Sequence, residues 1–248
     1  MRDYSKFFLI LAFILIVVAF FVANVEITHE LSWISVIFII SLAIPSYLAL
    51  FTWLGWEKAI EAIIILSIYA LTIETVAIIT GIPYSNFEYS NLIGMKIWGY
   101  TPFTVPFSFV PLFIGSIYLA SLKTTNKFKI SILAALFVLI ADLVLDPAAV
   151  ALNFWIWEAN GIFYGVPLMN FIGWIITGFI AALIFIILFR DKINDNKPKA
   201  MISSLFLIIS FWAAVCIYLG LLIPGIIGII FIIYILKVTN IEIGRFNA

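Results

Sequence analysis

The chain has 248 residues and no net charge, and 65% of its residues are hydrophobic while only 10% are charged. A soluble domain is about half apolar and about a quarter charged, so this composition excludes an ordinary soluble protein. The absence of a basic excess argues against a nucleic-acid partner. With one Cys (Cys216) and one His (His29), the chain can form no internal disulfide and no Cys/His metal cluster. The composition is typical of an integral membrane protein.

Apolar runs recur along the chain, and each is long enough to cross a bilayer. The runs are continuous rather than alternating, so they predict helices and not a β-barrel. We expect an all-α integral membrane protein in which residues 1–248 form a single transmembrane helical domain. The spans are predicted at about 6–23, 31–54, 59–80, 102–122, 128–146, 167–189, 201–220 and 223–238. Only a Pro224–Gly225 turn signal divides the last two, so one long kinked helix, and seven spans, is the alternative.

The distribution of basic residues favours eight spans. If the N-terminus is cytoplasmic, twelve of the thirteen Lys and Arg residues fall inside, and only Lys96 falls outside. Seven spans would put Lys237 and Arg245 outside. We therefore predict a multi-pass protein of the cell membrane with both termini in the cytoplasm.

This orientation gathers several acidic side chains toward the outer face. Asp142 and Asp146 are four residues apart and share one face of the fifth span. An acid inside a span is costly and indicates a functional site, because a carboxyl group in apolar surroundings can keep its proton and act as an acid. The alternative for Asp142 is a structural hydrogen bond across the bundle. The alternative for Asp146, which precedes Pro147, is an N-cap of a short following helix.

Three further acids lie on the outer side. Glu74 is inside the third span, where its alternative role is a hydrogen bond with a Thr or Tyr hydroxyl. Glu88 and Glu158 are in the two outer loops, residues 81–101 and 147–166, where an acid is usually solvated. Trp155 and Trp157 precede Glu158 and indicate either an interfacial aromatic belt or an aromatic pocket with an acid at its rim.

The outer loops also carry motifs. The segments TGIPYSNFEYSNLIGMKIWGYTPFTVPF and DLVLDPAAVALNFWIWEANGIFYGVPLMNFIGWIITG contain, in order, D-L-x-x-D-P, W-x-W-E, Y-G-x-P-x-x-N and G-W-x-x-T-G. Over about residues 70–180, this series resembles the carotenoid biosynthesis membrane-protein family, whose characterised members are acyclic carotenoid hydratases. The chain departs from the family at Pro83-Tyr84-Ser85, where the family usually has a Pro-Phe-Gly-like turn.

The resemblance implies addition of water across the terminal double bond of a linear carotenoid, giving a tertiary alcohol. The residues suit that chemistry: a desolvated carboxyl can protonate the alkene, aromatic faces can stabilise the cation, and a second carboxylate can deprotonate the attacking water. We expect Asp142 or Asp146 to be the acid and Glu74 its partner. The expected substrate-binding residues are Tyr84, Glu88, Trp155, Trp157, Glu158, Tyr164, Asn170 and Trp174, with Asn170 holding the water or the product hydroxyl.

Other functions remain open at this stage. A lycopene-cyclase-like enzyme would use the same acid and cation, and hydration of another polyprenyl lipid would change only the substrate. A small-molecule transporter or lipid-binding scaffold is the non-enzymatic alternative. The sequence carries no nicotinamide, flavin or metal motif, and hydration needs no cofactor. The predicted partners are a lipophilic isoprenoid and the bilayer, while the oligomeric state is not determined.

Overall fold

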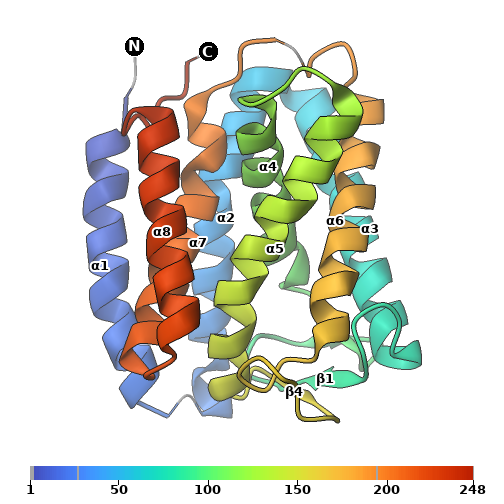
Figure 1. The fold of residues 1–248 in the computed structure, drawn as a ribbon, viewed down its shortest axis with the longest axis vertical. Coiled ribbons are helices and arrows are strands. Elements are labelled where there is room, and N and C mark those ends of the chain that lie inside the picture. Colours follow the sequence, from blue (N-terminus) through green and yellow to red (C-terminus); the bar gives the residue numbers. More distant parts are fainter. Residues whose placement is uncertain (1–2, 27, 194, 248) are drawn as a thin grey trace.

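The computed structural model describes residues 3–26, 28–193 and 195–247, which form an all-helical bundle (Figure 1). Its α-helices are α1 (Ser5–Asn24), α2 (Ser32–Leu54), α3 (Trp56–Thr80), α4 (Val105–Ser121), α5 (Lys127–Ala151), α6 (Leu168–Leu188), α7 (Ser203–Tyr218) and α8 (Leu222–Thr239). Short 3-10 helices, η1 (His29–Leu31) and η2 (Lys199–Ile202), precede α2 and α7. Seven helical segments in this part of the chain are long and apolar enough to span a membrane. The predicted multi-pass helical membrane protein is confirmed.

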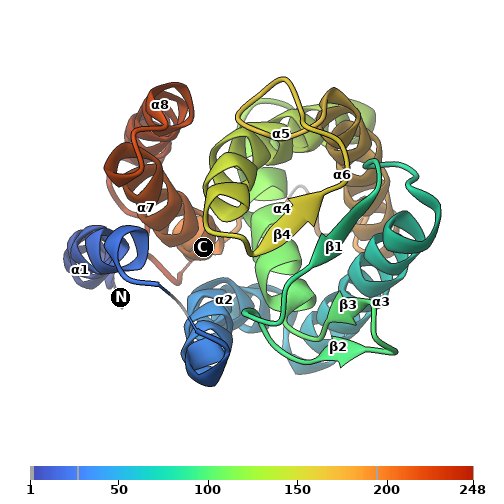
Figure 2. The same cartoon turned by 90° about the horizontal axis from the view of Figure 1, so that it is seen from below.

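Helix α4 is the eighth apolar helix, and at 17 residues it is too short to count among those seven. It lies in the middle of the bundle (Figure 2), and every residue from Phe109 to Ala120 is buried. Neighbouring helices surround α4. Its length therefore needs to fit the interior of the bundle and not the thickness of the bilayer. The outer helices face the lipid instead, with exposed side chains such as Phe13 on α1 and Ile68 on α3.

The last two spans are separate helices, so the alternative of one long kinked helix is wrong. The chain reverses between α7 and α8 at Gly220, whose φ of +74° favours glycine. The predicted turn at Pro224–Gly225 was also misplaced. Pro224 lies in the first turn of α8, where its missing N–H has no helical partner to lose.

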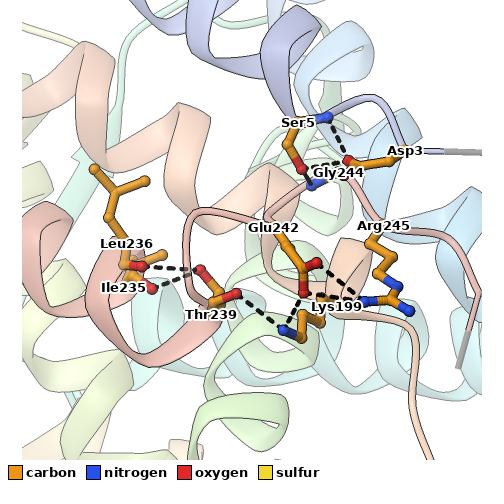
Figure 3. Close-up of polar contacts among 9 residues, drawn as sticks. All are labelled: Asp3, Ser5, Lys199, Ile235, Leu236, Thr239, Glu242, Gly244 and Arg245. Atoms are coloured by element: carbon orange, nitrogen blue, oxygen red, sulfur yellow. Dashed lines mark hydrogen bonds and ion pairs between the residues drawn. The ribbon is translucent and has the colours of Figure 1, made fainter.

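The two termini lie at the same end of the bundle, as an even number of crossings requires (Figure 1). They are joined there by polar contacts (Figure 3): the Gly244 N–H donates to Ser5 Oγ at 2.9 Å, and Arg245 Nη1 pairs with Glu242 Oε1 at 3.0 Å. Lys199 pairs with Glu242 and donates to the Thr239 carbonyl. A Cβ on Gly244 would lie 2.5 Å from the Ser5 backbone nitrogen, so only glycine permits this approach. Which side of the membrane this end faces stays a prediction.

Short strands cover the opposite end of the bundle (Figures 1 and 2). Strand β1 (Phe87–Tyr89) pairs antiparallel with β4 (Trp155–Trp157), and β2 (Lys96–Ile97) pairs with β3 (Thr101–Pro102). The β1–β4 pair joins the loop after α3 to the loop after α5. It therefore ties together the two outer loops.

Candidate active site

Two carboxyl groups of α5 share one amide donor from α6. Asp142 and Asp146 are each 3% exposed, as their spacing on one helical face and the apolar surroundings lead us to expect. Asn170 Nδ2 donates to Asp142 Oδ2 at 3.0 Å and to Asp146 Oδ2 at 2.5 Å. The hydrogen bond across the bundle that was the alternative for Asp142 is thus present, and it connects the carboxyl to a second acid. Asn170 holds both carboxyl groups in one place.

Asp146 does not cap a helix. Helix α5 continues past it to Ala151, with Pro147 inside the helix. The N-cap alternative is therefore wrong, and the second outer loop begins at about residue 152 rather than at residue 147. This continuation keeps Asp142 and Asp146 on one rigid helix, one turn apart.

Glu74 of α3 is the third buried acid, and it is also 3% exposed. The phenol of Tyr89, on β1, donates to Glu74 Oε2 at 2.9 Å. Burial raises the pKa of Tyr89 well above its usual value, so the phenol stays protonated and acts as a donor. The hydroxyl partner expected as the alternative for Glu74 is therefore found, and it comes from the outer loop.

The three buried acids have no cationic partner in the described part of the chain. Its ion pairs all lie near the end of the bundle that holds the termini, in the loop after α6 and around Glu242. Asp142 Oδ1 is also buried without a hydrogen-bond partner among the described residues. Like charges on carboxyl groups that share one donor, away from water, repel strongly. Carboxyl pairs arranged in this way share one proton.

The alternation of side chains along β1 and β4 lines the inner face with aromatic rings. Phe87 is opposite Trp157 and Tyr89 is opposite Trp155, with ring centroids 4.9 and 5.7 Å apart. Successive residues of a strand point to opposite faces, so the residues between them point outward. The two tryptophans thus belong to a pocket.

Three predicted substrate-binding residues lie elsewhere. Glu88 is the outward-facing residue of β1, opposite the exposed Ile156, because the alternation that buries Phe87 and Tyr89 exposes it. Glu158 is exposed and accepts a hydrogen bond from Asn86 Nδ2 at 3.0 Å, so it joins the two loops from outside. Tyr164 is 36% exposed, and its hydroxyl lies 3.4 Å from the Ile223 nitrogen of α8. Their predicted placement in the pocket is corrected.

The G-W-x-x-T-G motif, residues 173–178 of α6, forms the surface against which Tyr84 packs. A Cβ on Gly173 would lie 2.4 Å from a ring carbon of Tyr84, so glycine is needed for the loop to reach α6. The Tyr84 ring stacks on Trp174 at a centroid distance of 5.7 Å, and its hydroxyl donates to Thr177 Oγ1 at 3.0 Å. Gly178 meanwhile allows α6 to pack against the backbone of Ala135 on α5. The motif thus fixes an aromatic wall and the spacing of α5 and α6.

One cavity of about 480 Å³ joins these features. All three buried acids line it, together with Tyr84, Trp155, Trp157, Asn170 and Trp174. Eight of the eleven predicted site residues therefore meet in one place, drawn from α3, α5, α6 and the outer loops. The remaining wall is almost wholly apolar, and it extends to α1, α2, α4 and α7. A buried acid cluster at one end of a long apolar cavity suits a lipophilic substrate with one reacting end.

Comparison with known proteins places the chain in a family. Residues 31–235 match the carotenoid biosynthesis protein family, which covers most of the chain and includes the whole acid cluster. The chain belongs to this family. The prediction made from the loop motifs is confirmed, and the carotenoid biosynthesis match extends well beyond residues 70–180.

A curated relative of this carotenoid biosynthesis protein is the bisanhydrobacterioruberin hydratase of Haloarcula japonica. The two are 39% identical over 135 residues, which make up 52% of this chain and 45% of the hydratase. The match thus spans less than half of that relative. No solved structure matches the chain.

Sequence reasoning missed several residues of this cavity. Tyr89 was not singled out, although the F-E-Y alternation places it on the same face as Phe87. Phe109 of α4 contacts Trp174 at a centroid distance of 5.2 Å, and Phe38 and Phe211 line the far part of the cavity. These phenylalanines gave no signal, because an apolar residue in a membrane span looks the same whether it faces a cavity, lipid or another helix.

Proposed function

We propose that the protein is a carotenoid hydratase that adds water across the terminal carbon–carbon double bond of an acyclic carotenoid or related isoprenoid. The observation that carries the proposal is the set of three buried acids, with no cationic partner among the described residues, at one end of an apolar cavity. Family membership supports it, as does the hydratase activity for which the Haloarcula japonica relative is named. In this proposal the reaction needs no cofactor.

The first step is protonation of the alkene by the Asp142–Asp146 pair. The pair's proton goes to the less substituted alkene carbon, and the other carbon becomes a tertiary cation. Asp142 Oδ1 is the oxygen that no described residue engages, so it is the better placed of the two to deliver the proton. A positioned acid of this kind contributes about 10²–10⁴-fold to a rate. Asn170 keeps the two carboxyl groups in position.

The second step is stabilisation of the cation by aromatic faces. Tyr84 and Phe109 each pack against Trp174, and Trp155 and Trp157 line the same cavity from the loop after α5. The face of an aromatic ring attracts a cation, and Trp does so most strongly. The same rings limit the amount of water that reaches the cation, which restricts side reactions.

The third step is capture of the cation by water. Glu74 orients the water and takes one of its protons as the new carbon–oxygen bond forms. Tyr89 fixes the position of Glu74 through one oxygen, Oε2, and leaves the other oxygen for the water. Return of that proton to the aspartate pair restores the starting state. The net change is addition of one water molecule to give a tertiary alcohol, with no oxidation or reduction.

The test is expression of the protein in a lycopene-producing bacterium, followed by mass spectrometry and absorption spectroscopy of the extracted pigments. We expect a product heavier by one water molecule per modified end, with the absorption of the polyene unchanged. A product of unchanged mass with a shifted spectrum would indicate cyclisation and contradict the proposal. Unaltered pigment, confirmed with longer acyclic carotenoids and other polyprenyl lipids, would also contradict it and direct the search to transport.

A further inference from the structure

The cavity continues from the acids to the far side of the bundle. There its wall is formed by Val18, Phe21 and Val22 near the end of α1 and by Ile34 and Phe38 near the start of α2. Phe21 and Ile34 are 58% and 48% exposed, so this part of the cavity reaches the surface of the protein. Figure 2 shows α1 at the rim of the bundle, on the side opposite α3 and α6. We call the gap lined by these five residues the lateral opening.

The helical walls of the lateral opening face the bilayer. Its five defining side chains are all apolar and belong to two helices that are apolar enough to span the membrane, while Glu26 and Ser35 line the cavity beside them. Neighbouring side chains on the same helices, such as Val17 and Ile37, are exposed as well and belong to the lipid-facing surface. A cavity that opens onto hydrocarbon admits an apolar chain at little cost, because the chain exchanges one apolar environment for another.

Other stretches of the cavity wall are covered by protein. Strands β1 and β4 cover its outer end, and the buried residues of α4 and α7 fill the bundle below it. Phe38 of α2 contacts Phe211 of α7 at a centroid distance of 4.7 Å, and this contact bounds the cavity on that side. A linear carotenoid is about as long as the hydrocarbon core is thick, about 30 Å. Such a molecule cannot lie wholly within a cavity confined to the outer half of the bundle.

We propose that the isoprenoid chain of the substrate leaves the acid site through the lateral opening between α1 and α2 and extends into the bilayer. This inference rests on the proposed function, because it assumes that the end group of the same molecule sits at the acids. The lateral opening then selects for an extended, acyclic chain behind the reacting end. Three of its five residues are on α1, which precedes the matched segment 31–235, so chain selection involves residues outside that segment.

The first test fills the lateral opening from α2. Ile34→Trp adds bulk inside the lateral opening, and Ile37→Trp adds the same bulk to a side chain that is 57% exposed and outside the cavity wall. Because both side chains are exposed, both variants are expected to fold. Steric overlap predicts that Ile34→Trp lowers carotenoid hydration roughly tenfold or more and that Ile37→Trp leaves it unchanged. Equal rates in the two variants would overturn the lateral opening.

A second measurement does not depend on turnover. A linear polyprenyl probe with a photoreactive group at its tail is irradiated with the membrane-embedded protein, and labelled peptides are mapped by mass spectrometry. We expect labels on α1 and α2, lost in Val22→Trp and retained in Val17→Trp, because Val22 lines the cavity and Val17 faces lipid. Labels confined to other helices, or equal labelling of the two variants, would overturn the lateral opening even in an active hydratase.

The two measurements separate the two proposals. Labelling at the lateral opening in a protein that hydrates no carotenoid would contradict the proposed function while supporting the path of the chain. Hydration with no effect of Ile34→Trp, and no label on α1 or α2, would support the function and overturn the path.

Discussion

The protein has two clusters of acidic side chains, one at each end of the bundle, and they are built in opposite ways. Near the termini, Glu242 is paired with Lys199 and Arg245 and is partly open to water. At the other end, Asp142, Asp146 and Glu74 are buried and are bound by neutral donors, an amide and a phenol.

The difference shows what each cluster is suited to. A carboxylate paired with cations is held in its charged form, and at a partly exposed site such a pair contributes modestly to stability. A carboxyl group that is buried with only neutral donors can gain and lose a proton without breaking an ion pair, which is what acid–base chemistry needs. The cluster near the termini joins chain ends, while the cluster under the strands is available for chemistry.

The largest expected effect comes from removing the proposed proton donor. Asp142→Asn keeps the shape of the side chain and should lower carotenoid hydration by about 10²–10⁴-fold. Glu242→Gln, the same kind of change in the paired cluster, should leave hydration near the wild-type rate. Rates are measured in membranes containing equal amounts of folded protein. Full activity in Asp142→Asn, and in a parallel Glu74→Gln variant, would show that the buried acids are not catalytic.

Loss of the shared amide donor should have the next largest effect. Asn170→Ala leaves Asp142 Oδ2 and Asp146 Oδ2 without their donor, and an unsatisfied buried group costs about 1–3 kcal/mol. We expect hydration to fall by about five- to a hundredfold. Thermal unfolding of the same variant is the control, because a purely structural Asn170 would lower the Tm without changing the rate of the folded protein.

A smaller effect is expected at Tyr89, which we infer to be a positioning residue. Tyr89→Phe removes the hydrogen bond to Glu74 and keeps the ring against Trp155, so the rate should fall about tenfold. Its pH–rate profile should also shift, because Glu74 loses a donor that stabilises its charged form. Tyr100→Phe, on an exposed side chain of the same loop, is the matched control. An unchanged profile in Tyr89→Phe would rule out the positioning role.

The smallest expected effect is on thermal stability, and it concerns Glu242 at the end of the bundle that holds the termini. The hydrogen bond from Lys199 lowers the pKa of Glu242, so its contribution to stability is present above the unfolded pKa and is lost as the pH falls through the folded pKa. Glu242→Gln should therefore lower the Tm slightly at neutral pH and less in acid. Asp191→Asn, in a highly exposed pair with Arg190, should not change the Tm. A Tm difference between Glu242→Gln and the wild type that grows as the pH falls would contradict this account of Glu242.

The sequence alone determined the membrane class, the helices and much of the site. Continuous apolar runs dictate helices in a bilayer, since every backbone polar group must be satisfied internally. The cost of burying acids singled out Asp142, Asp146 and Glu74 without any structure. Helical periodicity put the two aspartates on one face, and the loop motifs indicated the family.

Only the tertiary structure decided which of the remaining residues meet. The continuation of α5 past Pro147 placed Asp146 inside a helix, because packing against neighbouring helices overrode a local cap signal. Pairing of β1 with β4 set a register that buries Tyr89 and exposes Glu88, because consecutive residues of a strand point to opposite faces. The lateral opening could not be predicted, because Val22 and Val17 are chemically the same residue and differ only in what the fold places beside them.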